Sequence, residues 1–186
     1  IATDAFDAPV PIAYVATGLD FPDALAAAAA AGAQGGPVLL TNPGFLPGET
    51  RAALEALQPA KIVVVGGTSV VSTAVEDALE QIQHNLERIA GNNRYKTAAL
   101  LAEFAANPNT VFVATGLSFP DALAGAAAAG YLGVPLLLTK PTYPVPPETL
   151  TKLSEFVASP MTVIVLGGTS VVSQWVSWEL WLAANG

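Results

Sequence analysis

The 186-residue sequence is 52% hydrophobic and only 12% charged, which excludes an intrinsically disordered chain. Its net charge of −8 argues against a nucleic acid partner, because binding to phosphates requires a basic surface. The chain has no cysteine and a single histidine, so disulfides and thiolate metal sites are excluded, and we predict neither a metal nor a cofactor.

The first part of the chain alternates short apolar runs with helical patterns. Strands are predicted at three apolar runs bounded by Gly or Pro, which are Ala13–Ala16, Val38–Thr41 and Ile62–Val65. Their continuous apolarity indicates burial on both faces, as in a parallel sheet. Between the first two runs lies an alanine-rich helix, for which Pro22 suits the first turn and Gly32 the stop. A second helix is predicted over Glu49–Leu57, after a Pro/Gly loop.

The second half of the chain repeats this order. ATGLDFPDALAAAAAAG at 16–32 recurs as ATGLSFPDALAGAAAAG at 114–130, with fifteen of seventeen positions identical at an offset of 98. GGTSVVS at 66–72 recurs unchanged at 167–173, an offset of 101. We therefore predict an α/β fold of two tandem Rossmann/flavodoxin-like lobes, residues 1–90 and 91–186. Each is expected to hold a mostly parallel sheet of about four strands with helices on both faces.

Further expectations concern the segment that joins the two copies and the first residues of the chain. A short strand near Leu86–Ala90 is predicted to finish the first copy. The segment Gly91–Ala98 precedes the second copy and has no counterpart before the first, so we expect the first copy to begin inside its first helix, cut from something longer. The opening IATDAFDAPV lacks a basic n-region, so no signal peptide is expected in it. No apolar run approaches the ~20 residues that span a bilayer, so we expect no membrane insertion.

Two loops recur between a strand and the following helix, at the sheet edge where ligands bind in open α/β folds. Helix N-termini there are expected to present free backbone N–H groups, which suit anions or sugar hydroxyls. The predicted binding residues in these loops are Thr17, Gly18, Gly66 and Gly67 in the first copy and Thr115, Gly116, Gly167 and Gly168 in the second. Asp23 and Asp121 follow in the first helical turn, where a carboxylate either complements the helix dipole or contacts a ligand.

Basic residues gather only at the junction between the copies. Arg88, Arg94 and Lys96 are three of the seven Lys and Arg residues. On a structural interpretation Arg94 and Tyr95 pack between layers; on a functional one Arg94 and Lys96 form a local positive site for a polyanion. The two are not exclusive. We expect Arg94 to matter more for polymer binding than any carboxylate, because an acidic chain holds a polyanion only where local charge reverses its field.

Two enzymatic interpretations find little support. VVVGGTSVV lacks the G-x-G-x-x-G spacing of a dinucleotide site and the Lys of a Walker loop, so a tight strand-to-helix turn is favoured. Neither Ser69 nor Ser170 lies in G-x-S-x-G, and the only histidine, His84, has no counterpart in the second copy. A domain binding a nucleotide or other small ligand, and part of a surface hydrolase, stay open as alternatives.

Four motifs in order make the chain resemble the bacterial cell wall-binding repeat 2 family. The second copy shows all four, namely Gly91–Ala98, Ala114–Leu123, Pro135–Thr139 and Gly167–Ser173. The first copy shows the last three, namely Ala16–Leu25, Pro37–Thr41 and Gly66–Ser72. The resemblance implies a non-catalytic module that holds surface-layer proteins, autolysins or other surface proteins noncovalently to an anionic cell-wall polysaccharide. It places the protein outside the cell, at the wall.

The resemblance also implies packing with further repeats, because such repeats usually occur in sets of three. Trp175, Trp178 and Trp181 recur every three residues near the C-terminus. A spacing of three drifts round a helix, so at least one indole is expected to escape its own lobe, and exposed aromatic patches usually mark interfaces. We therefore predict self-association or an apolar patch where a third module docks.

Overall fold

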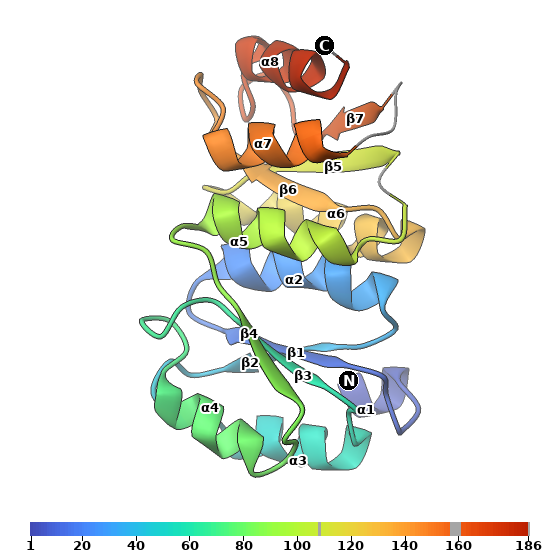
Figure 1. The fold of residues 1–186 in the computed structure, drawn as a ribbon, viewed down its shortest axis with the longest axis vertical. Helices are drawn as coiled ribbons and strands as arrows, with labels where there is room; N and C mark the ends of the chain where they lie inside the picture. The colour runs from blue at the N-terminus through green and yellow to red at the C-terminus, as the bar shows by residue number, and fades with distance from the viewer. Residues whose placement is uncertain (108, 157–160, 186) are drawn as a thin grey trace.

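The computed structural model describes residues 1–107, 109–156 and 161–185 (Figure 1). The helices are α1 (Ala2–Ala5), α2 (Phe21–Ala33), α3 (Gly48–Leu57), α4 (Thr73–Glu80), α5 (Arg94–Leu101), α6 (Phe119–Leu132), α7 (Pro147–Glu155) and α8 (Gln174–Asn185), with a 3₁₀ turn η1 (Ala102–Phe104). The strands are β1 (Ala13–Thr17), β2 (Val38–Thr41), β3 (Ile62–Val65), β4 (Leu86–Ile89), β5 (Thr110–Thr115), β6 (Leu136–Thr139) and β7 (Thr162–Val165). None of the helices described combines the length and apolarity needed to cross a membrane.

The strands form two parallel sheets, which confirms the predicted fold class. The first sheet has the order β2-β1-β3-β4 and the second the order β6-β5-β7. β4 is the junction strand predicted near Leu86–Ala90, and it pairs with β3 in parallel from Leu86 to Ile89. Among the described residues the second sheet has three strands, because no segment takes the place beside β7 that β4 takes beside β3. We call residues 1–90 the first lobe and 91–186 the second; this division of the chain stays a prediction.

Five layers stack along the long axis of the molecule (Figure 1). Helices α3 and α4 cover the outer face of the first sheet, where Leu54, Leu57 and Leu79 are buried. Helices α7 and α8 cover the outer face of the second sheet in the same way. Between the sheets lies one layer of α2, α5 and α6, and its side chains form a single core with both inner sheet faces. The two lobes therefore share a core rather than merely touching.

The alanine-rich helices meet closely at a pair of equivalent glycines. Gly32 was expected to end its helix, and this is wrong: α2 continues to Ala33. Gly32 instead faces Gly130 of α6, and a Cβ atom on Gly32 would lie 2.6 Å from the Gly130 Cα atom. At the other end of the same helices, the rings of Phe21 and Phe119 meet edge to face with centroids 6.1 Å apart. Small side chains between these points let the two helix backbones approach, which explains the alanine-rich motif.

Replacing Gly32 by Ala tests this close approach. We expect Gly32→Ala to lower the free energy of unfolding by about 1–3 kcal/mol, because the added methyl forces α2 and α6 apart. Gly44→Ala is the matched control, since a Cβ there meets nothing within 4 Å and should change stability by less than about 0.5 kcal/mol. Urea unfolding followed by circular dichroism measures both. Equal stability of the two variants would show that the helices do not depend on this contact.

Candidate functional site

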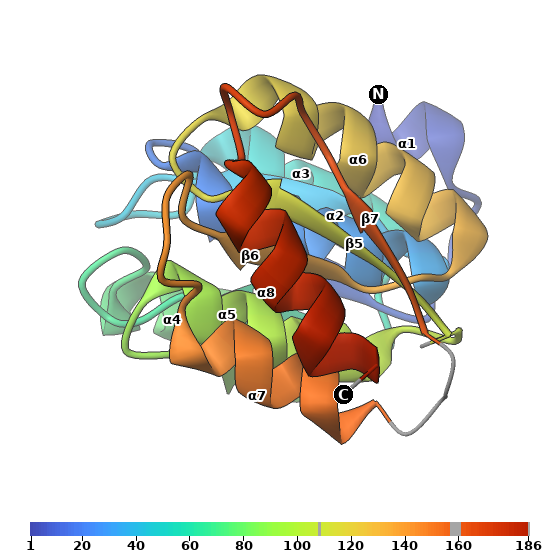
Figure 2. The same ribbon diagram turned by 90° about the horizontal axis from the view of Figure 1, so that it is seen from above.

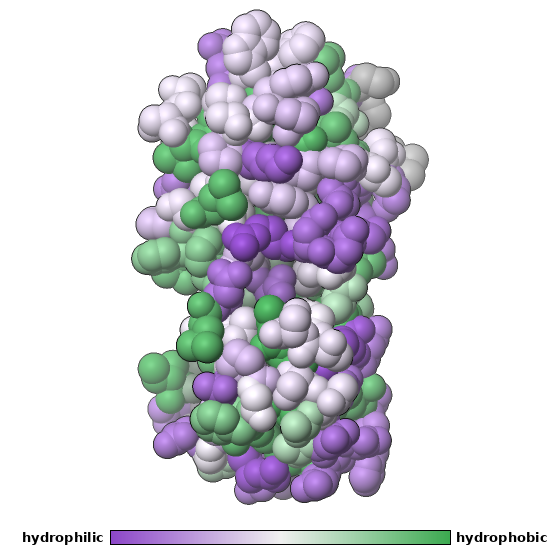
Figure 3. All heavy atoms as spheres, turned by 90° about the vertical axis from the view of Figure 1, so that its left-hand side faces the viewer, coloured by the Kyte–Doolittle hydropathy of each residue, from purple (hydrophilic) through white to green (hydrophobic). Residues whose placement is uncertain are grey.

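A polar pocket of about 190 Å³ opens at the carboxyl ends of the first sheet's strands, beside the junction. It is lined by Thr17, Asp20, Pro22, Asp23, Gly67, Ser69, Val70, Gly91, Asn92, Asn93, Arg94 and Thr97. Figure 3 shows the side of the molecule on which these loops lie, with hydrophilic residues gathered across its middle. Four of the predicted residues, Thr17, Asp23, Gly67 and Arg94, thus come together from segments far apart in the sequence.

Arg94 links the two lobes at this pocket. It stands at the first position of α5, after Asn93, whose side chain caps the helix by accepting from the Lys96 N–H at 2.9 Å. The Arg94 Nη1 donates to the carbonyl oxygen of Gly116 at 2.5 Å, and its Nη2 lies 3.5 Å from a carboxylate oxygen of Asp20. Arg94 therefore has the packing contacts that the structural interpretation predicted. Its role toward a polyanion stays a prediction.

Arg88 is held by hydrogen bonds inside the first lobe. Its Nη1 donates to the carbonyl oxygen of Gly66 at 2.6 Å, and its Nη2 and Nε donate to the carboxylate of Glu76 at 2.8 and 3.3 Å. The half-buried guanidinium thus holds the Gly-Gly loop against α4. Arg88 adds no free charge to the pocket, so the basic cluster read from the sequence reduces to Arg94 and Lys96.

Asp23 and Asp121 each pack on the Gly-Gly loop of their own lobe. Gly66 has a φ of +100° and Gly167 one of +99°, a backbone region that favours glycine. A Cβ atom on Gly66 would lie 2.7 Å from an Asp23 carboxylate oxygen, and Gly167 and Asp121 repeat this at 2.7 Å. The same contact in both copies favours a structural role for the two carboxylates.

The pKa of Asp23 is raised above its ordinary value. Burial is the largest cause, and the nearby Asp20 charge adds to it, while Thr97 and Arg94 act in the opposite direction. The folded chain therefore holds an ionised Asp23 at a cost in free energy.

The expectation of free N–H groups in these loops is wrong at three glycines. The Gly18 N–H donates to the Thr41 carbonyl at 3.0 Å, and the Gly116 N–H donates to the Thr139 carbonyl at 2.8 Å. The Gly66 N–H donates to Ile89 at 2.9 Å. The physical reason is that parallel pairing continues past the ends of β1, β5 and β3, so the sheet uses these donors.

The two threonines of the loops are buried and bonded locally. The Thr17 hydroxyl oxygen accepts from the Leu19 N–H, and the Thr115 hydroxyl oxygen accepts from the Leu117 N–H, each at 3.2 Å. Both side chains therefore shape the turn into the helix. A ligand can contact the turn that these threonines stabilise. Each hydroxyl oxygen, however, already accepts one backbone hydrogen bond.

The remaining predicted residues lie outside the polar pocket. Asp121, Gly167 and Gly168 occupy the corresponding edge of the second sheet, where both glycines are exposed. Lys96 lines a separate hollow with Glu148 and Lys152. Within the described ranges, five of the seven basic side chains are ion-paired, namely Arg51, Lys61, Arg88, Arg94 and Lys152. Lys96 and Lys140 have no such partner there. The pKa of Glu148 is lowered chiefly by its hydrogen bond with Asn93, and the charges of Lys140 and Lys96 add to this.

Sequence reasoning missed Asp20, although a signal was present. Asp20 is one of the two positions at which the seventeen-residue motif differs between the copies, with Ser118 as its counterpart. It caps α2 by accepting from the Phe21 N–H at 3.1 Å and faces Arg94 across the lobes. A difference inside an otherwise identical motif points to a contact that only one copy makes. Over the described residues, no group of three or more His, Cys, Asp or Glu side chains is placed to hold a metal ion.

The raised pKa of Asp23 predicts how stability depends on pH. A folded-state pKa above the ordinary 3.8 means that the fold binds the proton more tightly than the unfolded chain does. The resulting stabilisation is present below pH 3.8 and is lost as the pH rises through the folded value. As the pH rises through the folded pKa, the parent loses this stabilisation, whereas Asp23→Asn, which has no carboxyl group at this position, does not. We therefore expect the free energy of unfolding of Asp23→Asn to increase relative to that of the parent over this pH range, and the difference to remain at neutral pH.

Urea titrations of the parent and Asp23→Asn from acidic to neutral pH measure this difference. It should persist at high salt, because salt screens the Asp20 charge but leaves the burial of Asp23 unchanged. A difference that does not vary with pH would contradict the assignment of the raised pKa to Asp23.

Comparison with known proteins identifies the family. The sequence profile of the family described as cell wall binding domain 2 (CWB2) matches residues 1–76 and 88–177. In Bacillus subtilis (strain 168), N-acetylmuramoyl-L-alanine amidase LytC is 31% identical over 164 residues, which is 88% of this chain and 32% of that protein. The amidase enhancer of the same organism is 32% identical over 158 residues, 83% of this chain and 22% of that protein. The chain thus spans about a third or less of these relatives.

Solved structures share the fold. Cwp6 from Clostridium difficile matches with a TM-score of 0.86 at 23% identity, over 96% of this chain and 28% of that chain. Cwp8 from Clostridium difficile matches with a TM-score of 0.80 at 26% identity, over 94% of this chain and 29% of that chain. Because the family match extends over both lobes, the chain belongs to the cell wall binding domain 2 family and is a cell-wall-binding module, which places its action at the wall or cell surface.

Proposed function

We propose that the chain is a non-catalytic module that anchors a surface or secreted protein noncovalently to an anionic cell-wall polysaccharide. The observation that carries this proposal is the polar pocket built around Arg94 at the junction of the two lobes, in a chain of the cell wall binding domain 2 family. The relatives' names concern amidases, but the chain covers too little of those proteins for their activity to be transferred.

The pocket lining also holds the carboxylates of Asp20 and Asp23, so its neutral polar groups and Arg94 are the part that suits a sugar polymer carrying negative charge. Asn92, Asn93 and Ser69 offer amide and hydroxyl groups that match sugar hydroxyls. Arg94 makes two contacts, to the Gly116 carbonyl and weakly to Asp20, which leaves further guanidinium N–H donors for a phosphate or carboxylate. The 3.5 Å contact with Asp20 is long enough for an incoming anion to compete with it.

The net charge of the chain makes local charge decisive. A chain with a net charge of −8 repels a polyanion in general, so binding depends on the few cations that are not neutralised by neighbours. Lys96 and Lys140 make no ion pair within the described residues, and Lys96 follows Arg94 by two positions on α5. We propose that Arg94, whose 3.5 Å contact with Asp20 an anion can displace, anchors the polymer in the pocket and that Lys96 adds attraction from the separate hollow that it lines.

Binding to purified cell walls tests the function. We expect the chain to sediment with intact walls and to stay in solution with walls stripped of their anionic secondary polymer. Binding should weaken with added salt, because the Debye length is already about 8 Å at physiological strength. Retention on stripped walls would overturn the choice of polymer. A thermal shift with nucleotides, or release of products from walls, would instead favour a small-ligand domain or a hydrolase.

Substitution of Arg94 tests the site. We expect Arg94→Ala and Arg94→Gln to weaken wall binding at least tenfold, because both remove the charge that meets the anion. Arg51→Ala is the matched control, since Arg51 lies on α3 and pairs with Glu55 away from the pocket. Melting curves establish that each variant is folded. A folded Arg94→Gln that binds walls like the parent would restrict Arg94 to packing.

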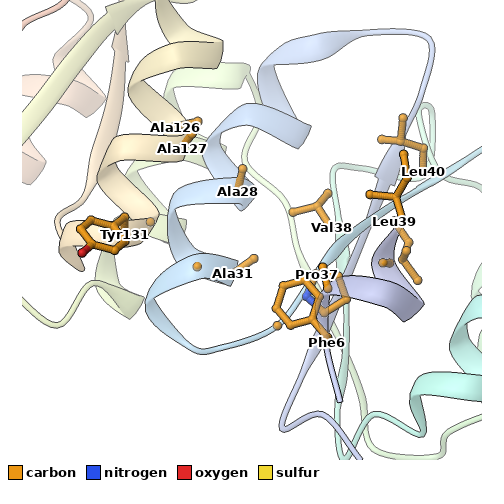
Figure 4. A pocket seen from close by; sticks show the side chains of 16 residues that line it. Phe6, Ala28, Ala31, Pro37, Val38, Leu39, Leu40, Ala126, Ala127 and Tyr131 are labelled. Atoms are coloured by element: carbon orange, nitrogen blue, oxygen red, sulfur yellow. The ribbon is translucent and has the colours of Figure 1, made fainter. Parts of the chain in front are cut away.

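We also propose that the module packs with further repeats or with itself. An apolar groove of about 530 Å³ runs between α2, α6 and the edge strand β2 (Figure 4). Leu40 of β2 is 52% exposed there, while the matching Leu138 of β6 is 1% exposed. The β2 side of the first lobe thus presents exposed apolar surface, and we propose that a further repeat or a second copy packs there.

The tryptophans add a second uncovered surface. Trp175, Trp178 and Trp181 are 70%, 57% and 56% exposed on α8, which confirms that the indoles escape their own lobe. Exposed aromatic area of this extent is costly in water, at about 25 cal/mol per Å².

Sedimentation tests the assembly. We expect the mass of the parent to rise with concentration and Leu40→Asp to shift the equilibrium at least tenfold toward the monomer, because a charge in the groove opposes apolar contact. Leu19→Asp, an exposed leucine outside the groove, serves as control. A strictly monomeric parent at all concentrations would remove self-association from the proposal.

A further inference from the structure

The loops that follow β2 and β6 carry exposed aromatic side chains at equivalent positions. We call residues 42–47 the α3 loop and residues 140–146 the α7 loop. Phe45 and Tyr143 are 60% and 65% exposed, and they are related by the repeat offset of 98. Phe45 belongs to a lobe that another follows, and Tyr143 to a lobe that another precedes, so a neighbouring lobe on either side leaves this position uncovered. Among the described residues, neither ring packs in a core cluster.

Hydrogen bonding explains the other residue that the two loops share. The Ser72 N–H donates to the Pro43 carbonyl and the Ser173 N–H donates to the Pro141 carbonyl, each at 2.8 Å. This proline position therefore joins each loop to the end of a Gly-Gly loop. Apart from the proline and the aromatic residue, the loop sequences NPGFLP and KPTYPV differ. An aromatic residue that is exposed in both copies and packs in neither core suits a ligand rather than the fold.

The α7 loop adjoins the polar pocket. Both loops follow the carboxyl ends of parallel strands, which is the edge at which the pocket opens. Figure 1 and Figure 2 agree in placing the orange loop before α7 and the green junction before α5 on the same side of the molecule. Asn93, which lines the pocket, donates through Nδ2 to a carboxylate oxygen of Glu148 at 2.7 Å. Glu148 stands in the first turn of α7, directly after the loop.

Lys140 gives the α7 loop a positive charge. It follows β6 directly, is exposed, and takes part in none of the ion pairs among the described residues. Two carboxylates lie beside the loop, and both already accept hydrogen bonds, Glu148 from Asn93 and Glu179 from the Val145 N–H at 2.9 Å. The loop thus combines an exposed cation with an exposed ring.

We propose that Tyr143 and Lys140 form a second contact site for the anionic wall polysaccharide, next to the Arg94 pocket. This inference rests on the function proposed above. One face of the Tyr143 ring packs on a sugar ring, and the Lys140 ammonium group attracts a phosphate or carboxylate of the same polymer. Phe45 supplies the equivalent ring in the first lobe, where Asn42 stands in place of the lysine.

The chemistry of both groups favours this occupant. A pyranose ring has C–H groups on its faces and hydroxyls at its rim, so it packs on an aromatic face, which carries the negative part of the ring quadrupole. The lysine ammonium group is a compact charge without the fixed fork of a guanidinium, so it accepts anions in varied orientations. A polymer that reaches both the pocket and the α7 loop gains affinity, because the second contact is made within one bound chain.

Titration with the polymer tests the site directly. The probe is the anionic polymer released from the walls, added to the full isotope-labelled chain and followed by nuclear magnetic resonance. We expect the amide signals of Thr142, Tyr143 and Val145 to shift together with those of Asn92 and Arg94, at the same midpoint. Shifts at the pocket alone would overturn the second site and leave the proposed function intact. No shift at either place, with no retention on intact walls, would overturn both.

Variants at Tyr143 separate ring stacking from general apolar contact. We expect Tyr143→Leu to weaken binding of the released polymer about fivefold. Tyr143→Phe should bind like the parent, because it keeps the ring that Phe45 has in the first lobe. Tyr131→Leu is the matched control, since Tyr131 is 91% exposed but lies near the end of α6, at the opposite edge of the sheets. Equal binding by the parent and a folded Tyr143→Leu would refute the stacking contact.

The salt dependence of a charge variant tests Lys140. We expect Lys140→Gln to weaken polymer binding about threefold at low salt and less as salt is added, because exposed charges are screened. The effect of Tyr143→Leu should persist in salt. Lys61→Gln makes the same change of net charge at the opposite edge, where Lys61 precedes β3 and pairs with Glu87. Equal weakening by the two lysine variants would show that only net charge matters and would remove Lys140 from the site.

Discussion

The close approach of α2 and α6 is the contact on which the rest of the structure depends. Gly32 and Gly130 meet backbone to backbone, and no side chain larger than hydrogen fits at Gly32 without moving the helices. Because the helices lie this close, a single layer serves as the inner cover of both sheets. That shared layer fixes the distance between the two lobes, and with it the position of Arg94 relative to Asp20.

The duplication supplies two similar lobes, but their surroundings make them unequal. β4 and α5 come from the segment that joins the copies, and they cover β3 in one lobe and β6 in the other. The equivalent positions, β7 in the second lobe and β2 in the first, keep exposed apolar residues, Ile164 and Leu40. The central contact pairs equivalent residues, Gly32 with Gly130 and Phe21 with Phe119, so the inequality comes from the joining segment and not from that contact.

The polar pocket arises from the same asymmetry. Its walls are loops of the first lobe, and its rim is the junction segment with Arg94, so it needs both copies. Arg94 lies between the Gly116 carbonyl and the Asp20 carboxylate, where it ties the lobes and also faces the pocket. The lining holds one guanidinium, Arg94, and two carboxylates, Asp20 and Asp23, so the proposal that the pocket meets an anionic polymer depends on the unused N–H donors of Arg94.

Much of the architecture could be predicted from the sequence. Continuous apolar runs such as Ile62–Val65 predicted buried parallel strands, and the repeated motifs predicted two similar lobes and the family. The spacing of three predicted that at least one tryptophan on α8 is exposed, and the structure exposes all three. These are local properties, because periodicity and motif identity are carried by neighbouring residues.

Only the tertiary structure decided how the copies meet and which groups are free. Gly32 looks like a helix stop in sequence, but its close contact lies 98 residues away, at Gly130. The N–H groups of Gly18 and Gly116 look like free donors, but neighbouring strands accept from them. Asp20 gains its partner Arg94 from the other lobe, 74 residues on. Such facts depend on contacts between distant segments, which local periodicity does not encode, so the sequence determined the elements and their order while packing determined the site.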